Sequence, residues 1–382
     1  MIVLCLNSGS SSLKLGLFSG DDRLASCAID GIGGATGRLR VRGKGGAALR
    51  DEPSRAANHG DAVHAGLDAL AGHGFPPPDA AGHRFVHGGP RQHEPRMIDA
   101  DLFAVLRDAV PFAPLHLPAE LLGVDAVTSR SPGLPQVACF DTHFHWDMPE
   151  VARRLPLPRE LYEAGIRRYG FHGLSYESVV AELGADVLGR AVIAHLGNGA
   201  SMAAVRDGRS VDTTMGMTPA GGFMMGTRSG DLDPGVFVHL LDAHGYDARR
   251  LEDLVDRRSG LLAISQSTSD MRALLEARAS NAKAALAVDM FCRQAAKAAA
   301  ALVTALGGLD SLVFTGGIGE HAAPVREAIC SRLAHVGVRI DPARNATHAP
   351  MINSDASACS VRIVPANEEL TIARHTRAVL GD

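Results

Sequence analysis

One short pattern of apolar and polar positions occurs twice along this chain. Residues 2–18 form two apolar runs joined by a bare turn at residues 7–12, and residues 191–206 repeat that arrangement around residues 197–201. Each segment predicts a β-hairpin. Because turns without large side chains let backbone N–H groups approach an anion closely, the repetition indicates a duplicated architecture that grips phosphate from both halves.

Strand-like and helix-like periods alternate along the rest of the chain, which is typical of an α/β fold. The pattern restarts after a Pro-rich connector near residue 145, so we expect one domain over residues 1–144 and a second over 145–367. The last helix, within 368–382, is expected to return to the first domain. We predict strands at 83–89, 136–145, 311–320 (ending in a Gly turn) and 361–370, and helices at 61–72, 99–109, 118–129, 174–183, 235–243, 249–257, 269–278, 281–306 and 322–334.

Composition narrows the class of protein. The 382 residues are 46% hydrophobic and 21% charged, as in a globular protein of two domains. A net charge of −4 argues against nucleic-acid and anionic-membrane binders. The six cysteines lack C-x-x-C spacing, which disfavours zinc ribbons. Without a signal peptide or a long apolar segment, we expect a cytoplasmic protein.

The first turn carries phosphate-binding chemistry. Residues 7–14 offer the Asn7 amide, several hydroxyls and the Lys14 ammonium, and phosphate favours neutral donors at short range plus one charge. The segment is not a Walker A loop, because the next residues alternate like a strand. The alternative is an ordinary Ser/Gly hairpin turn.

Two further glycine-rich turns are candidates for nucleotide contact. Asn198-Gly199 follows His195 in the second hairpin, and residues 315–320 follow a buried strand. Glycines at the end of a strand let a nucleotide lie against the backbone. The G-x-G-x-x-G pattern of dinucleotide-binding folds is incomplete here, so dinucleotide binding is disfavoured.

Carboxylates follow two strands. Asp141 ends one strand, and Glu368 and Glu369 follow another. Such groups can hold Mg²⁺ beside substrate phosphates, and a helix cap or turn is the alternative for an isolated Asp. Asp141, His143 and His145 would share a strand face and mimic a transition-metal site, but we expect the strand to end near residue 142.

Three further side chains indicate anion binding. Arg84 lies in an apolar strand, and Arg228 lies in a Gly-rich segment. A buried charge needs a partner, and an anionic substrate supplies one; a structural ion pair is the alternative. His172 stands between glycines and could donate to a developing charge, or it could be a satisfied core histidine.

The motifs together resemble those of the acetate kinase family, part of the acetate and sugar kinase, Hsp70 and actin superfamily. The resemblance covers nearly the whole chain in consistent order. It rests on NSGSSSLK (7–14), GHRFVHGG (82–89), APLH (113–116), FDTHFH (140–145), YGFHG (169–173), HLGNGAS (195–201), MGTRSGDLDP (225–234), TGGIGE (315–320) and PANEEL (365–370).

The resemblance implies two duplicated ribonuclease-H-like (actin-like ATPase) domains with a central cleft. It implies reversible phosphoryl transfer from ATP to acetate, giving acetyl phosphate and ADP, with Mg²⁺, or Mn²⁺ in its place, as cofactor. It also implies a homodimer; nucleic-acid and membrane partners are already disfavoured by the net charge. The catalytic positions that match are His172, Arg228, Arg84, Asp141 and Asn7.

The remaining site residues are carried over in three groups. Those at the metal are Asn7 and Glu368. Those at the acetate and its methyl group are Arg84, Val86, Leu115, His116, Phe171 and Pro219. Those at the nucleotide are Ser10, Ser12, Lys14, His195, Leu196, Gly197, Asn198, Gly199, Asp270, Met271, Arg272, Gly316, Gly317, Ile318, Gly319 and His321.

The chain departs from the family pattern on the donor side. His321 stands where Asn is usual, and Met271 replaces an aromatic residue, which bears on adenine packing. Leu174 and Tyr176 stand where Thr and His are usual after the FHG motif.

Three other functions are alternatives to an acetate kinase. They are a kinase for propionate or butyrate, a pyrophosphate-using variant, and a non-catalytic ATP clamp, which would not need Arg84 and Arg228.

Overall fold

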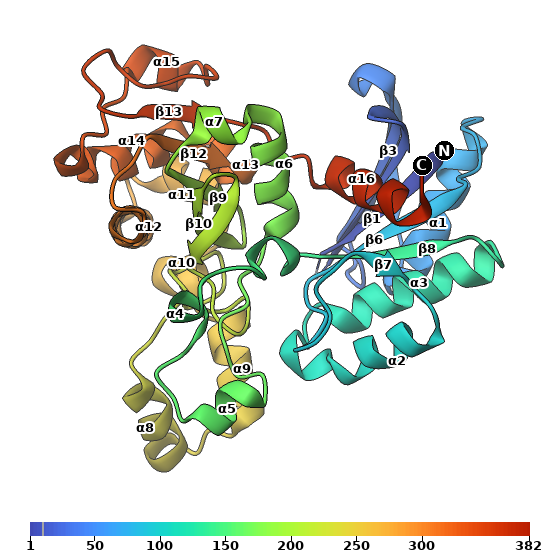
Figure 1. Cartoon of the computed structure of the whole chain (residues 1–382), viewed down its shortest axis with the longest axis horizontal. Coiled ribbons are helices and arrows are strands. Elements are labelled where there is room, and N and C mark those ends of the chain that lie inside the picture. The colour runs from blue at the N-terminus through green and yellow to red at the C-terminus, as the bar shows by residue number, and fades with distance from the viewer. Residues whose placement is uncertain (10) are drawn as a thin grey trace. The chain divides into compact units, whose positions relative to one another are not determined.

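The computed structural model describes residues 1–9 and 11–382, so Ser10 lies outside the described residues. The chain divides into two compact units (Figure 1). The first unit comprises Met1–Trp146 and Asn367–Asp382, and the second comprises Asp147–Ala366. Each unit is a β-sheet with helices packed on it, which confirms the predicted α/β class.

The sheet of the first unit has the order β5-β4-β3-β2-β1-β6-β8-β7. An antiparallel meander, β1 to β5, leads into a parallel part in which β6 pairs with both β1 and β8. The strands are β1 (Ile2–Ser8), β2 (Ser12–Ser19), β3 (Asp22–Asp30), β4 (Gly37–Gly43), β5 (Ala48–Ser54), β6 (Ala80–Phe85), β7 (Arg96–Met97) and β8 (Gln136–Phe140).

Helices cover both faces of this sheet. Alternate apolar residues of β1, such as Leu4 and Leu6, share a core with Val63 of α1 (His59–Gly72) and Val127 of α3 (Leu117–Arg130). On the other face, α16 (Glu368–Leu380) packs so closely that a β-carbon on Gly82 would meet its side chains. The C-terminal helix therefore belongs to the core of the first unit. The unit also contains α2 (Ala100–Asp108), η1 (Lys44–Gly46), η2 (Val110–Phe112) and η3 (His143–His145).

The sheet of the second unit has the order β11-β10-β9-β12-β13. Its first three strands are antiparallel neighbours, and β9, β12 and β13 run parallel. This is the order and direction of β3-β2-β1-β6-β8 in the first unit, so the structure repeats one sheet plan. The strands are β9 (Ala191–Leu196), β10 (Ala200–Arg206), β11 (Arg209–Thr213), β12 (Ser311–Thr315) and β13 (Ser360–Ile363).

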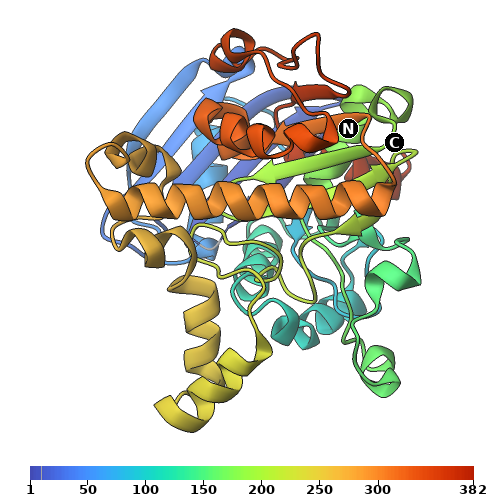
Figure 2. The same cartoon turned by 90° about the vertical axis from the view of Figure 1, so that its left-hand side faces the viewer.

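A long helix, α12 (Ala282–Leu306), packs along this sheet and is seen in side view in Figure 2. Asn281 caps its first turn by accepting hydrogen bonds from two backbone N–H groups. The other helical segments are α4 (Glu150–Arg153), α5 (Arg159–Glu163), α6 (Gly173–Leu183), α7 (Ala185–Leu188), α8 (Pro234–His244), α9 (Ala248–Arg257), α10 (Gly260–Ser265), α11 (Met271–Ala277), α13 (Gly316–His321), α14 (Ala323–Arg332), η4 (Ala334–Val336) and α15 (Pro342–Ala346).

The glycine turn predicted after β12 differs in the structure, because α13 begins directly at Gly316. Gly316 has φ +77°, and a β-carbon there would lie 2.8 Å from the Leu196 carbonyl oxygen, so only glycine fits this junction. Glu320, one turn on, accepts a hydrogen bond from Gly316 N at 3.0 Å. Of the helices in residues 1–9 and 11–382, none is long and apolar enough to cross a bilayer.

Candidate functional site

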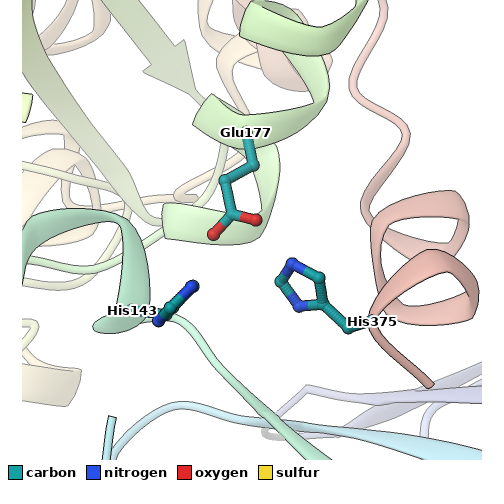
Figure 3. Close-up of side chains that lie close together, drawn as sticks. All are labelled: His143, Glu177 and His375. Atoms are coloured by element: carbon teal, nitrogen blue, oxygen red, sulfur yellow. The ribbon is translucent and has the colours of Figure 1, made fainter. Parts of the chain in front are cut away.

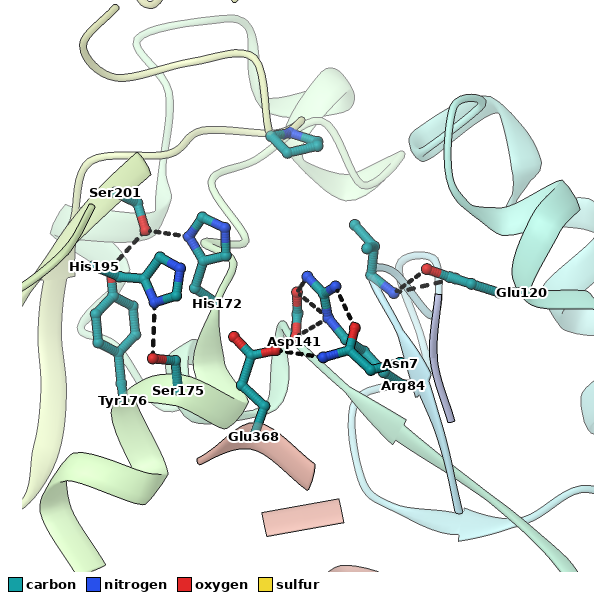
Figure 4. A network of polar contacts seen from close by, with 12 residues as sticks. Asn7, Arg84, Glu120, Asp141, His172, Ser175, Tyr176, His195, Ser201 and Glu368 are labelled. Atoms are coloured by element: carbon teal, nitrogen blue, oxygen red, sulfur yellow. Dashed lines mark hydrogen bonds and ion pairs between the residues drawn. The ribbon is translucent and has the colours of Figure 1, made fainter. Parts of the chain in front are cut away.

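Three side chains meet at the carboxyl ends of neighbouring strands in the first unit (Figure 4). Asn7 lies near the end of β1, Arg84 near the end of β6, and Asp141 directly after β8. Because β1, β6 and β8 are adjacent and parallel, their ends lie along one sheet edge, where ligands of α/β proteins commonly bind. With Glu368 they form what we call the strand-end cluster.

Arg84 is held in the cluster by two partners. Its Nε donates to Asp141 Oδ1 at 3.0 Å and its Nη2 to Asp141 Oδ2 at 2.6 Å, while Nη1 donates to Asn7 Oδ1 at 2.9 Å. Burial acts to lower the pKa of Arg84, but attraction to Asp141 and Glu368 outweighs it and raises the pKa. The guanidinium therefore stays charged and fixed in direction.

Asn7 links the arginine to a second carboxylate. Its Nδ2 donates to Glu368 Oε2 at 2.7 Å while its Oδ1 accepts from Arg84. The two hydrogen bonds therefore require the same orientation of the amide. Glu368 is the first residue of α16, where a helix N-terminus favours negative charge. The cluster thus offers carboxylate and amide oxygens beside one cation.

Glu120 is a buried acid that the sequence analysis did not single out. Only 2% of it is exposed, and its two carboxyl oxygens accept from Val86 N at 3.3 and 3.2 Å. Burial raises its pKa to about 8. The signal available in the sequence is an acid between apolar residues such as Leu117 and Leu121, both of which are buried in α3.

The residues expected around the acyl group come from both units. In the first unit, Val86 is buried just after β6, Leu115 is half-buried and His116 directly precedes α3. In the second unit, Phe171 is buried, and the Pro219 carbonyl accepts from Arg228 Nη1 at 3.3 Å.

Two stacked imidazoles lie in the second unit (Figure 4). The rings of His172 and His195 are 4.3 Å apart at 20°. Each Nδ1 is within hydrogen-bond distance of a serine, at 2.8 Å from Ser201 for His172 and 2.8 Å from Ser175 for His195. His172 adopts a left-handed conformation, φ +60°, before α6, a strained geometry often associated with functional sites.

The other ring nitrogen of His172 converges with an arginine. A β-carbon on Gly199 would lie 3.4 Å from His172 Nε2 and 3.2 Å from Arg228 Nη1. The backbone of the second hairpin turn is therefore close to one imidazole N and one guanidinium N of the same unit. This combination of donors suits an anion that carries negative charge on several oxygens.

A cavity of about 700 Å³ opens beside this turn within the second unit. Its volume suits a nucleoside-sized ligand. Eight of the residues predicted for the nucleotide line it, namely Gly197, Asn198, Asp270, Met271, Arg272, Gly317, Ile318 and His321. Sequence analysis missed the others, which are Ser269, Leu275, Glu276, Ala322 and Pro324.

The other described residues that were predicted for the nucleotide are not among the lining residues of this cavity. Lys14 and Ser12 are in β2 of the first unit, where Lys14 pairs with Asn7 across the hairpin. Ser10 lies outside the described residues. Leu196, Gly199, Gly316 and Gly319 of the second unit are not among the cavity's lining residues, and His195 faces the turn, 3.8 Å from where a β-carbon of Gly197 would lie.

The Asp-x-His-x-His segment does not form a strand face. β8 ends at Phe140, and His143 and His145 lie in η3. His143 instead makes an edge contact with His375 of α16, with ring centroids 5.6 Å apart. Figure 3 labels both histidines. The strand-based transition-metal site is therefore absent from this segment, all of which the structure describes.

One family of known proteins matches nearly the whole chain. Residues 2–374 match the model of the Acetokinase family. The chain is 42% identical to acetate kinase of Rhodopseudomonas palustris (strain ATCC BAA-98 / CGA009) over 390 residues, covering 98% of this chain and 97% of the relative. It is also 42% identical to acetate kinase of Streptomyces griseus subsp. griseus over 399 residues, covering 100% and 96%.

Solved structures give the same result. A propionate kinase from Francisella tularensis is 35% identical with a TM-score of 0.92, and acetate kinase from Porphyromonas gingivalis is 37% identical with a TM-score of 0.86. Each comparison covers 99% of both chains. Sequence and structure agree over the full length, and the chain therefore belongs to the acetokinase family.

Proposed function

We propose that this protein transfers a phosphoryl group reversibly between ATP and acetate. An acetate oxygen forms a bond to the γ-phosphorus while the bond from that phosphorus to the β–γ bridging oxygen breaks, giving acetyl phosphate and ADP. The observation that carries the proposal is the fixed, charged Arg84 at the sheet edge of the first unit. A guanidinium fixed in direction suits a carboxylate or a phosphoryl group.

The chemistry demands little beyond positioning. Acetate is ionised at neutral pH, so no side chain has to remove a proton from the nucleophile. Phosphoryl transfer passes through a loose transition state whose charge lies on the equatorial oxygens, and enzymes stabilise it with cations and aligned donors. Arg84 and Arg228 supply positive charge, and Asn7 and His172 supply directed hydrogen bonds.

We assign the acceptor to the first unit and the donor to the second. Arg84 would bind the acetate and the transferring group, with Asp141 fixing the guanidinium and Val86 facing the methyl group. In the second unit the nucleoside would occupy the 700 Å³ cavity, and the turn at Asn198 and Gly199 would hold phosphates. We propose that the other residues expected at the acetate and at the nucleotide have the roles that the family resemblance implies.

The strand-end cluster has the donors that Mg²⁺ favours. Hard carboxylate and amide oxygens from Glu368, Asp141 and Asn7 lie within one hydrogen-bonded group, and Mg²⁺ is usually held by one or two carboxylates plus water and phosphate oxygens. Glu368 and Asn7 would hold the ion, and when bound it would neutralise charge on the ATP phosphates. Mn²⁺ takes the same donor types.

Propionate is the second candidate acceptor, because the propionate kinase structure resembles this chain closely. Val86 is 2% exposed, and its backbone is held by Glu120. A buried valine beside the acyl group would restrict chain length, but one methylene discriminates by only about 1–3 kcal/mol. We therefore propose acetate as the preferred substrate and propionate as a weaker substrate.

Homodimer formation is proposed by analogy with the family, and light scattering would test it.

A hydroxamate assay of acyl phosphate tests the proposal directly. Acetate, propionate and butyrate would each be combined with ATP, GTP and pyrophosphate in the presence of Mg²⁺. We expect the highest kcat/KM with acetate and ATP. Absence of acyl phosphate in every combination would overturn the function and leave the non-catalytic ATP clamp, whereas a preference for pyrophosphate would overturn the donor.

A further inference from the structure

A chain of two buried hydroxyls connects His172 to Tyr176 (Figure 4). Ser201 Oγ lies 2.8 Å from His172 Nδ1 and 2.5 Å from the Tyr176 hydroxyl oxygen. Tyr176 and Ser201 have no exposed surface, and His172 is 9% exposed. The contacts join α6, β10 and the residue before α6, so they hold the imidazole from behind.

The chemistry of the three groups sets the direction of the hydrogen bonds. A phenol, with a pKa near 10, is a more acidic donor than an aliphatic alcohol, and a neutral imidazole nitrogen is a better acceptor than a hydroxyl oxygen. The favoured arrangement is therefore Tyr176 donating to Ser201 and Ser201 donating to His172 Nδ1. When Nδ1 accepts, the proton of the neutral ring is on Nε2.

The position of Nε2 makes this proton useful. Nε2 faces Gly199 beside Arg228 Nη1, each within 3.4 Å of where a β-carbon of Gly199 would lie. An N–H at this point would donate to an oxygen of an anion held by Arg228, whereas a lone pair there would repel the same oxygen. The tautomer of His172 thus decides whether it attracts or repels the phosphoryl group.

We propose that Tyr176 is a positioning residue which, through Ser201, holds His172 as the tautomer with its proton on Nε2, directed at the transferring phosphoryl group. This inference rests on the proposed function. It also gives a role to Tyr176, which stands where the family usually has histidine. His195 offers an internal comparison, because its Nδ1 contacts a different serine, Ser175.

Side-chain ¹⁵N NMR of the full-length protein, recorded without substrates, tests the arrangement independently of activity. The histidine signals of His172 would be assigned by their loss in His172→Gln. Tyr176→Phe removes one oxygen and keeps the ring, and Ser201→Ala removes the middle group. We expect His172 to be predominantly Nε2–H in the parent, with a measurable Nδ1–H population in both variants and no change in the tautomer of His195.

Kinetics provide the second readout. Tyr176→Phe should lower kcat about tenfold, the size expected for one lost buried hydrogen bond, with KM for acetate and ATP nearly unchanged. Ser201→Thr, which retains a hydroxyl, should keep most of the activity lost in Ser201→Ala. Tyr169→Phe is the matched control, because it removes another buried phenol oxygen, one that donates to the Gly165 carbonyl at 2.7 Å, and it should change neither the tautomer nor kcat.

The outcomes separate the inference from the function beneath it. Unchanged His172 signals in Tyr176→Phe and Ser201→Ala would overturn the relay, and a changed tautomer with unchanged kcat would overturn its role in catalysis. If the parent forms no acyl phosphate, the proposed function fails, while the NMR signals still decide whether Tyr176 sets the tautomer. If Tyr176→Phe does not fold, Ser201→Ala against Ser201→Thr gives the same decision.

Discussion

Arg84 and Asp141 form a two-pronged ion pair, in which Nε and Nη2 of the guanidinium donate to the two carboxylate oxygens at 3.0 and 2.6 Å. The arginine side chain is 13% exposed and the aspartate 1%. Asp141 therefore fixes the direction of the Arg84 guanidinium. Because both groups are buried, each charge depends on the other for compensation. Breaking such a pair on one side is costly, since the remaining charge is uncompensated.

Loss of either proposed catalytic arginine should abolish most of the activity. We expect Arg84→Ala and Arg228→Ala each to lower kcat by about 10³-fold, in the range measured for arginines that stabilise phosphoryl-transfer charge. Both variants should retain the circular dichroism spectrum of the parent. The hydroxamate assay measures the effect, and wild-type acetyl phosphate formation by Arg228→Ala would contradict the assignment.

Two controls separate catalysis from stability. Arg84→Ala should also reduce the free energy of unfolding, and the double variant with Asp141→Asn should recover part of that loss without recovering activity. Arg190 provides a matched exposed pair, because its Nε and Nη2 donate to Asp310 at 2.9 and 2.7 Å. Arg190→Ala should leave kcat unchanged and should lower the free energy of unfolding less than Arg84→Ala does, because both groups of this pair are solvent-exposed.

Shortening Val86 should relax the choice of acid. Val86→Ala removes two methyl groups beside the proposed acyl site, so the ratio of kcat/KM for propionate to that for acetate should rise about tenfold. The assay compares both acids in parent and variant. Val127→Ala, a change of the same size in the core of the first unit, should lower stability without altering the ratio, and an unchanged ratio in Val86→Ala would exclude Val86 from the acyl site.

Glu120 should make the stability of the protein fall as pH rises. Its folded pKa of about 8 lies above the value of 4.5 for an unperturbed glutamate, so the folded state binds the proton more tightly than the unfolded chain. The contribution is complete below pH 4.5 and is lost as pH rises through 8, because the unfolded chain then holds fewer protons.

Urea unfolding at pH 5, 6, 7 and 8 would measure this effect. We expect the free energy of unfolding of the parent, relative to Glu120→Gln, to decline across this range, because glutamine keeps the shape of the side chain and does not titrate. A difference between parent and variant that is constant with pH would contradict the raised pKa.

A side chain at Gly317 should not destabilise the fold, but a large one should weaken ATP binding. A β-carbon there would have no described heavy atom of the surrounding structure within 4 Å, and the residue lines the nucleotide cavity. Gly317→Ala should stabilise α13 by about 0.5–1 kcal/mol, whereas Gly317→Leu should raise KM for ATP at least about tenfold by filling the cavity.

Gly72 is the matched control for this substitution. It is the last residue of α1, and a β-carbon there would likewise have open space among the described residues. Gly72→Leu should leave KM for ATP unchanged. An unchanged KM for ATP in Gly317→Leu would move the nucleotide away from this cavity.

Local sequence signals account for most of the secondary structure but not all of it. The helix period and the Asn281 cap predict α12, and apolar runs around bare turns predict the hairpins β1–β2 and β9–β10. The pattern did not predict β3 or β11. β11, with the sequence RSVDT, has a single large apolar residue, and it is a strand because its backbone pairs with β10.

By itself, the sequence determined the α/β class, the repeated hairpin and the family, because periodicity and short motifs are properties of neighbouring residues. The tertiary structure decided which of these residues meet. Arg84 and Asp141 are 57 positions apart, and Asn7 and Glu368 are 361 apart. Strand order brings Asn7, Arg84 and Asp141 to one edge, and the packing of α16 on the sheet brings Glu368 to it. The roles of Glu120, Ser201 and Tyr176 depend in the same way on burial and on contacts with distant residues, which no local pattern encodes.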